Sequence, residues 1–154
     1  MGKTTLLEKL VPEISSRGLV VSLIKHSHKD IDIDRPGKDS YRLRESGCKE
    51  VLLLGNARWA LMHELRAAAE PSLDELLKRM QVCDLVLIEG FKSGGFPKLE
   101  VWRESLGLAG LWAHKPDIVA VASDRPVQDT RLPQFVLTDI RSIGSFVVQN
   151  AKDC

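Results

Sequence analysis

The chain has 154 residues, a length typical of one domain with a substantial core, and we expect a single domain over residues 1–154. Charged residues make up 28% of it and the formal net charge is +1, so no global field favours nucleic acid or an anionic membrane surface. No apolar run reaches the roughly 20 residues of a membrane span, and the 3 cysteines form no C-x-x-C pair. A cytoplasmic protein that recognises its ligands through local sites is expected.

Residues 2–4 read Gly-Lys-Thr, the last three positions of the phosphate-loop motif G-x-x-x-x-G-K-[ST]. Apolar residues then recur with the spacing of one helix face, at Leu6, Leu7, Leu10, Val11 and Ile14. Such a helix places its N-terminal dipole and free N–H groups beside Lys3 and Thr4, which favours a bound anion. We interpret Gly2, Lys3 and Thr4 as part of a phosphate loop; the alternative is an ordinary helix that carries a lysine.

The first half of the chain continues with a predicted helix end at Gly18 and a short apolar strand over residues 19–24. A polar stretch over residues 26–40 reads as a long loop, and loops of this length in compact domains tend to be functional. Asp39 or Ser40 is expected to cap a helix that ends at Ser46. Residues 51–54 and 58–65 are the next predicted strands.

In the second half, a helix is predicted to open at Ser72 and to run to Met80, because its apolar residues follow helical spacing. The continuous apolar run over residues 85–88 indicates a central parallel strand covered on both faces. Further strands are predicted at 99–103, 118–122 and 135–137, and a closing helix at 140–148. The alternation predicts a three-layer α/β domain with a mostly parallel central sheet flanked by helices.

Glu89 comes directly after the apolar run at residues 85–88. Ligands of open α/β sheets bind at the carboxyl ends of the strands, so this carboxylate is placed to reach Mg²⁺ or a water bound to it. The alternative is a carboxylate that merely ends a strand in solvent.

The polar segment over residues 25–40 combines cationic donors for phosphate with carboxylates for a metal. Asp34 and Gly37 form a D-x-x-G spacing, a weak signal by itself, and a hydrated charge run is the alternative. His26 and His28 have no third histidine or cysteine nearby, so we favour phosphate or surface contacts over zinc.

Asp124 ends the predicted strand at residues 118–122. An ionised carboxylate can accept hydrogen bonds from N1–H and the 2-amino group of guanine, which adenine does not offer. No N-K-x-D signature is present, so recognition of guanine by Asp124 is a hypothesis from this donor and acceptor argument alone.

With these segments in order, the chain resembles the MobB family of molybdopterin-guanine dinucleotide biosynthesis adapter proteins. The matching segments are residues 2–10 (GKTTLLEKL), 25–28 (KHSH), 32–42 (DIDRPGKDSYR), 58–62 (RWALM), 87–92 (LIEGFK) and 119–124 (VAVASD). The resemblance implies a homodimeric P-loop fold that binds GTP with Mg²⁺, hydrolyses it weakly and assists a MobA-type nucleotidyltransferase that joins GMP to molybdopterin. In the family pattern a strand and the G-x-x-x-x residues precede Gly2, and we therefore expect weak or absent GTP hydrolysis from this polypeptide.

The resemblance also implies residue roles. The end of the phosphate loop matches Gly2, Lys3, Thr4 and Thr5; the loop facing the phosphates matches Asp34, Gly37, Lys38, Asp39 and Ser40; and the Walker B position matches Glu89. A first hypothesis makes Lys3, Asp34 and Glu89 catalytic, with Mg²⁺ held by Thr4, Asp34 and Glu89. The second is a non-catalytic adapter that binds the nucleotidyltransferase or a pterin phosphate through Lys25, His26, His28, Arg35 and Lys38.

Overall fold

The computed structural model describes residues 2–27, 31, 33–91, 94–128 and 130–153. It divides into two compact units: unit 1 combines Met1–His26 with Val82–Cys154, and unit 2 is Ser27–Gln81. Each unit is described by itself below, and a single domain over residues 1–154 stays a prediction. No helix in the described part of the chain is long and apolar enough to cross a membrane.

Unit 1 contains the parallel strands and the two longest helices. Its elements are α1 (Lys3–Ser15), β1 (Val21–Lys25), β4 (Leu85–Glu89), β5 (Lys98–Trp102), β6 (Ile118–Ser123), β7 (Gln134–Val136) and α4 (Ile140–Gln149). The 3₁₀ turns η1 (Glu104–Leu106) and η2 (Leu111–Ala113) follow β5 and were not predicted from the sequence. The order of helices and strands confirms the α/β class.

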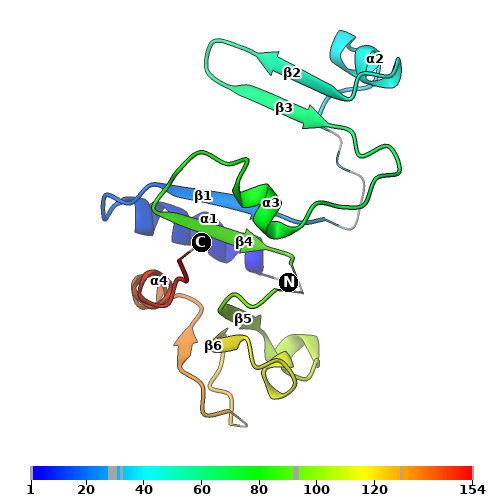
Figure 1. Cartoon of the computed structure of the whole chain (residues 1–154). Coiled ribbons are helices and arrows are strands. Elements are labelled where there is room, and N and C mark those ends of the chain that lie inside the picture. The colour runs from blue at the N-terminus through cyan, green and yellow to red at the C-terminus, as the bar shows by residue number, and fades with distance from the viewer. Residues whose placement is uncertain (1, 28–30, 32, 92–93, 129, 154) are drawn as a thin grey trace. The chain divides into compact units, whose positions relative to one another are not determined.

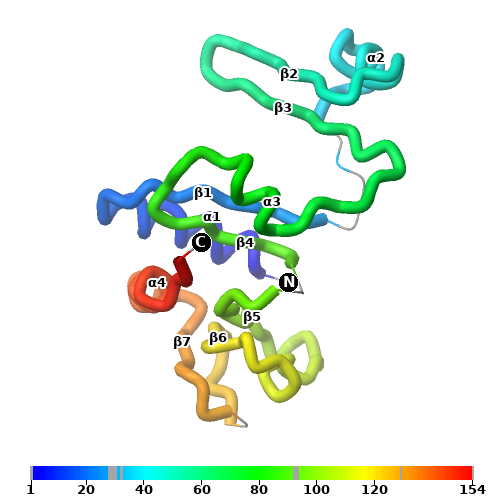
Figure 2. Tube along the Cα trace, viewed as in Figure 1, coloured from blue at the N-terminus to red at the C-terminus, as the bar shows by residue number. Residues whose placement is uncertain are grey.

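The strands of unit 1 form two parallel sheets where we expected one. β1 pairs with β4, with Val21 opposite Leu85 and Lys25 opposite Glu89. β5, β6 and β7 form the other sheet in that order, and Figure 2 shows them side by side. Among the described strands, β4 pairs only with β1, and β5 only with β6.

One apolar core nevertheless joins both sheets to the helices. Seven buried residues form it: Leu6, Leu10 and Ile14 of α1, Leu85 and Leu87 of β4, Ala122 of β6 and Ile143 of α4. The helical spacing of the α1 residues is what turns all three toward β4. Val86 and Ile88, on the opposite face of β4, are half-buried, so the strand predicted to be covered on both faces is covered more fully on the Leu85 and Leu87 face. The helices of this core pack on the Leu85 and Leu87 face.

Unit 2 is built around an antiparallel hairpin of β2 (Glu50–Leu54) and β3 (Trp59–His63), with α2 (Asp39–Glu45) and α3 (Leu73–Leu77) (Figure 1). The residue that caps α2 is Lys38, so the prediction of Asp39 or Ser40 was wrong by one or two positions. Ser72 caps α3 and forms a capping box with Glu75. This helix is shorter than predicted, because Arg79 and Met80 bond to carbonyls three residues back and tighten the last turn.

Candidate functional site

Helix α1 begins as an anion site would require. Gly2 precedes it with φ 124°, a conformation that glycine adopts readily, and no side chain caps the helix. The first turn contains no acidic residue and exposes Lys3, Thr4 and Thr5. The positive end of the helix dipole and its free N–H groups are therefore available to a phosphate.

Glu89 is the last residue of β4 and lies at the start of α1. The sequence predicted this carboxylate at the carboxyl end of the strand. The Thr4 hydroxyl donates to Glu89 Oε1 at 3.1 Å, across 85 positions of sequence. The Glu89 side chain is 11% exposed, and its other oxygen lies 3.6 Å from Lys25 Nζ. A hydroxyl and a carboxylate held together offer the oxygen ligands that Mg²⁺ prefers, so these residues fit the metal that the sequence implies. Figure 1 shows the start of α1 beside the arrowhead of β4.

The turn after β4 fixes Glu89 against the end of β1. The His26 N–H donates to the Glu89 carbonyl at 2.7 Å, which extends the pairing of the two strands by one residue. Gly90 has φ 99°, and a Cβ there would lie 2.3 Å from the His26 carbonyl oxygen. The rings of His26 and Phe91 are 4.7 Å apart. The two segments that the sequence singled out, at residues 25–26 and 89–91, are therefore packed together.

Two charged residues lie at the ends of β5 and β6. Asp124 accepts a hydrogen bond from the Glu104 N–H at 3.3 Å, and its other oxygen lies 3.9 Å from Arg103 Nη1. Arg103 also lies against the start of α1, with Nε 3.1 Å from the position of a Cβ on Gly2. Binding of guanine through Asp124 stays a prediction. Arg103 was not predicted, although it ends a strand as Glu89 and Asp124 do.

Asp34 lies in unit 2, where its carboxylate is buried and held by an arginine. Arg44 Nη2 donates to Asp34 Oδ1 at 3.1 Å, and the Asp34 side chain is 3% exposed. Arg44 also contacts Glu64 at 3.3 Å and lies 4.9 Å above the ring of Tyr41. The hydrogen bond to Asp34 is the main cause that raises the pKa of Arg44 above its ordinary value. Asp34 therefore stabilises the segment before α2, a role that the sequence did not suggest.

The remaining loop residues are located at and before the start of α2. Arg35, Gly37, Lys38 and Asp39 are exposed, and Ser40 is half-buried in the first turn of the helix. Gly37 has φ 85°, and the Lys38 N–H donates to the Arg35 carbonyl at 3.2 Å, which closes a turn. His28 lies outside the described residues.

Unit 1 thus brings together one part of the predicted site: Gly2, Lys3, Thr4, Thr5, Lys25, His26 and Glu89, with Asp124 beside Arg103. Unit 2 contains the other part, which is Asp34 and the residues from Arg35 to Ser40. The predicted ligands of Mg²⁺, Thr4, Asp34 and Glu89, include residues of both units, and this metal site stays a prediction.

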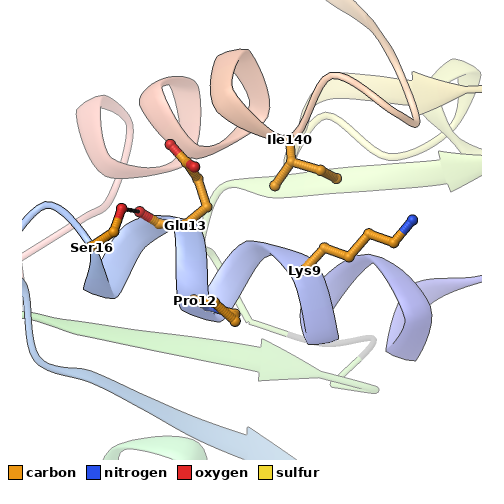
Figure 3. A pocket seen from close by; sticks show the side chains of 5 residues that line it. All are labelled: Lys9, Pro12, Glu13, Ser16 and Ile140. Atoms are coloured by element: carbon orange, nitrogen blue, oxygen red, sulfur yellow. Dashed lines mark hydrogen bonds between the residues drawn. The ribbon is translucent and has the colours of Figure 1, made fainter.

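A surface depression between α1 and α4 is distinct from this site. It is lined by Lys9, Pro12, Glu13, Ser16 and Ile140, and Figure 3 shows the first four along the second half of α1 and Ile140 at the start of α4. The Ser16 hydroxyl donates to the Glu13 carbonyl at 2.7 Å there. The lining includes no residue of the first turn of α1, so we assign the depression no part in phosphate binding.

Comparison with known proteins identifies close relatives. The family model "MobB: Molybdopterin guanine dinucleotide synthesis protein B" matches residues 1–124. A molybdopterin-guanine dinucleotide biosynthesis adapter protein of Escherichia coli (strain K12) is 40% identical over 158 residues, covering 96% of this chain and 86% of the relative. The protein of the same name from Haemophilus influenzae is 41% identical over 144 residues, covering 92% of this chain and 77% of the relative.

Solved structures agree on the fold. A crystal structure of molybdopterin-guanine biosynthesis protein B superposes with a TM-score of 0.76 at 24% identity, covering 96% of this chain and 92% of that one. The crystal structure of Bacillus subtilis MobB gives a TM-score of 0.71 at 25% identity, covering 99% and 93%. These likenesses confirm the P-loop-like α/β fold that was predicted.

Proposed function

The chain belongs to the MobB family, and on that premise we propose that it is a GTP-binding accessory protein of molybdenum cofactor biosynthesis that assists the attachment of GMP to molybdopterin. The observation that carries the proposal is the hydrogen bond from Thr4 to Glu89. It joins the Gly-Lys-Thr segment, at the uncapped start of a helix, to a carboxylate at the end of a parallel strand. That pairing is what a phosphate site with a bound Mg²⁺ requires.

In this proposal Lys3 neutralises charge on the outer phosphates of GTP, and the Thr4 hydroxyl and Glu89 carboxylate hold Mg²⁺. When bound, the metal supplies positive charge next to the phosphate oxygens. Hydrolysis is proposed to be weak at most. Asp124 is proposed to accept hydrogen bonds from the guanine base.

The loop of unit 2 is proposed to approach the phosphates through Arg35, Gly37, Lys38, Asp39 and Ser40. The exposed cations Arg35 and Lys38, just before α2, support this role. A catalytic or metal-binding role for Asp34 would use the second lone pair of a carboxylate oxygen, since Arg44 bonds to both oxygens.

The proposed partners are a MobA-type nucleotidyltransferase and a second copy of the chain. The hairpin of unit 2 supports self-association, because one of its faces is apolar and exposed. Leu54 and Trp59 are paired across the strands and are 80% and 59% exposed, and Leu52 and Leu61 are the next pair on that face. Contiguous exposed apolar side chains of this kind mark interaction surfaces.

A second function is a non-catalytic adapter that binds the nucleotidyltransferase or the pterin phosphate without nucleotide turnover. The names of the Escherichia coli and Haemophilus influenzae relatives favour it, since both are called adapter proteins. Lys25 and His26, at the end of β1, and Arg35 and Lys38, before α2, supply cations for such contacts, and the same role is proposed for His28.

One experiment separates the two. A MobA-type nucleotidyltransferase is assayed for molybdopterin guanine dinucleotide formation with Mg²⁺ and GTP, alone and with the wild-type chain, Lys3→Ala or Lys9→Ala. Lys9 is the matched control, because it is an exposed lysine of the same helix away from its first turn. The GTP hypothesis predicts that wild type and Lys9→Ala raise the yield and Lys3→Ala does not. An equal gain with Lys3→Ala favours the adapter, and no gain with any chain contradicts both.

A further inference from the structure

We propose that Arg103 is a phosphate-binding residue of the site at the start of α1, an inference that rests on the proposed function of that site. Arg103 directly follows β5, and its guanidinium lies against the backbone of Gly2. Nε is 3.1 Å and Nη2 is 3.5 Å from the position that a Cβ on Gly2 would occupy. A residue 101 positions further along the chain is thereby placed beside the Gly-Lys-Thr segment.

The donors of Arg103 are available for a ligand. Among the residues that the structure describes, the guanidinium has one charged partner, Asp124, at 3.9 Å, which is too long for a hydrogen bond. Asp124 meanwhile accepts the Glu104 N–H. Arginine presents five N–H donors in a planar fork that matches phosphate oxygens, and 38% of this side chain is exposed.

The start of α1 also attracts anions. The helix begins with the positive end of its dipole, no acidic residue lies in its first turn, and Lys3 adds a cation. Arg103 brings a second cation to the same place, and two carboxylates lie nearby, Glu89 on the Thr4 hydroxyl and Asp124 at 3.9 Å from Arg103. A phosphate at the first N–H groups of α1 would be attracted by both cations.

Gly2 is the residue that allows Arg103 to approach the start of α1. Its φ of 124° disfavours any other residue, and a side chain there would displace the guanidinium. The close approach of Arg103 to the backbone therefore depends on the glycine of the phosphate-loop motif. Arg103 and the first N–H groups of α1 would then share one phosphate group.

Calorimetric titration of GTP with Mg²⁺, and separately of inorganic pyrophosphate, tests the proposal on wild type, Arg103→Ala, Arg103→Lys and Arg125→Ala. Arg125 is the matched control, because it lies near the same strand ends but pairs with Glu104 at 2.7 Å and is 71% exposed. Hydrogen bonds to charged groups contribute strongly to affinity, so Arg103→Ala should weaken the binding of both ligands about 10- to 100-fold. Arg103→Lys should recover part of this loss, and Arg125→Ala should change affinity less than about 2-fold, as expected of an exposed ion pair. Urea unfolding midpoints confirm that each variant is folded.

The outcomes distinguish this proposal from the function on which it rests. Wild-type affinity in Arg103→Ala, together with a loss of binding in Lys3→Ala, overturns the role of Arg103 and leaves the phosphate site in place. Loss of GTP affinity with unchanged pyrophosphate affinity also overturns it, because Arg103 would then act on the base through Asp124. A wild-type chain that binds neither ligand contradicts the phosphate site itself and Arg103 with it.

Discussion

Replacing Gly90 with alanine tests whether the turn after β4 positions Glu89. The new Cβ would lie 2.3 Å from the backbone carbonyl oxygen of His26, and the turn would have to keep φ 99° with a side chain present. Backbone strain of this kind costs about 1–3 kcal/mol. Crowding against a backbone atom, which cannot rotate away as a side chain can, costs about 1–3 kcal/mol more. We expect the free energy of unfolding to fall by about 2–6 kcal/mol.

The measurement is equilibrium unfolding in urea, with the slope compared between variants so that a change in midpoint can be attributed to stability. Gly95→Ala is the matched control, because a Cβ there meets nothing within 4 Å. It should change stability by less than about 0.5 kcal/mol. If Gly90→Ala is as stable as Gly95→Ala, the close packing of residues 89–91 on the end of β1 is wrong, and with it the placement of Glu89.

Three further predictions concern the core, the closing helix and self-association. Ile143→Ala should lower the free energy of unfolding by about 2–5 kcal/mol in urea, because the side chain is 0% exposed; a loss below about 1 kcal/mol would contradict the described core. Hydrogen bonding from the Ser142 side chain, and after it from the Ser142 N–H, lowers the pKa of Asp139, so the contribution of this carboxylate is complete above the unfolded pKa of about 3.9 and is lost as the pH falls through the folded pKa. Stability below about pH 4 should therefore depend less on pH in Asp139→Asn, as thermal melts across acid pH will show; identical profiles would refute this. Leu54→Lys should shift the proposed dimer to monomer in light scattering while Leu108→Lys, at a residue 66% exposed in unit 1, leaves the proposed dimer intact, and a dimer that survives both changes argues against the hairpin face.

Local sequence patterns predicted the elements of the fold well. The helical spacing from Leu6 to Ile14 places α1, and the apolar run at residues 85–88 places β4 to within one residue. These signals are short-range, because a buried helix face or strand requires apolar residues at a regular spacing in the nearby sequence. The two 3₁₀ turns after β5 carry no such period, and they were missed.

The candidate site was predicted in part, because only some of its residues have a local signal in the sequence. Glu89 and Asp124 were found because a polar residue after an apolar strand is visible in the sequence. Arg103 also follows a strand, but it was not predicted. The ion pair of Asp34 with Arg44 could not be predicted, since it depends on how the segment before α2 folds back onto the helix. The sequence suggested a metal ligand, and the structure adds a structural role for the same carboxylate.

The central claim is that Gly2, Lys3 and Thr4 bind the phosphates of GTP. The most direct measurement is calorimetric titration of GTP and of ATP, with Mg²⁺, into the 154-residue chain and into a chain extended by a strand and the G-x-x-x-x half of the motif, each with and without Lys3→Ala. We predict that GTP binds more tightly than ATP, that the extended chain binds more tightly than the shorter one, and that Lys3→Ala abolishes binding in both. Binding that is unchanged by Lys3→Ala, or no binding by either chain, would contradict the claim.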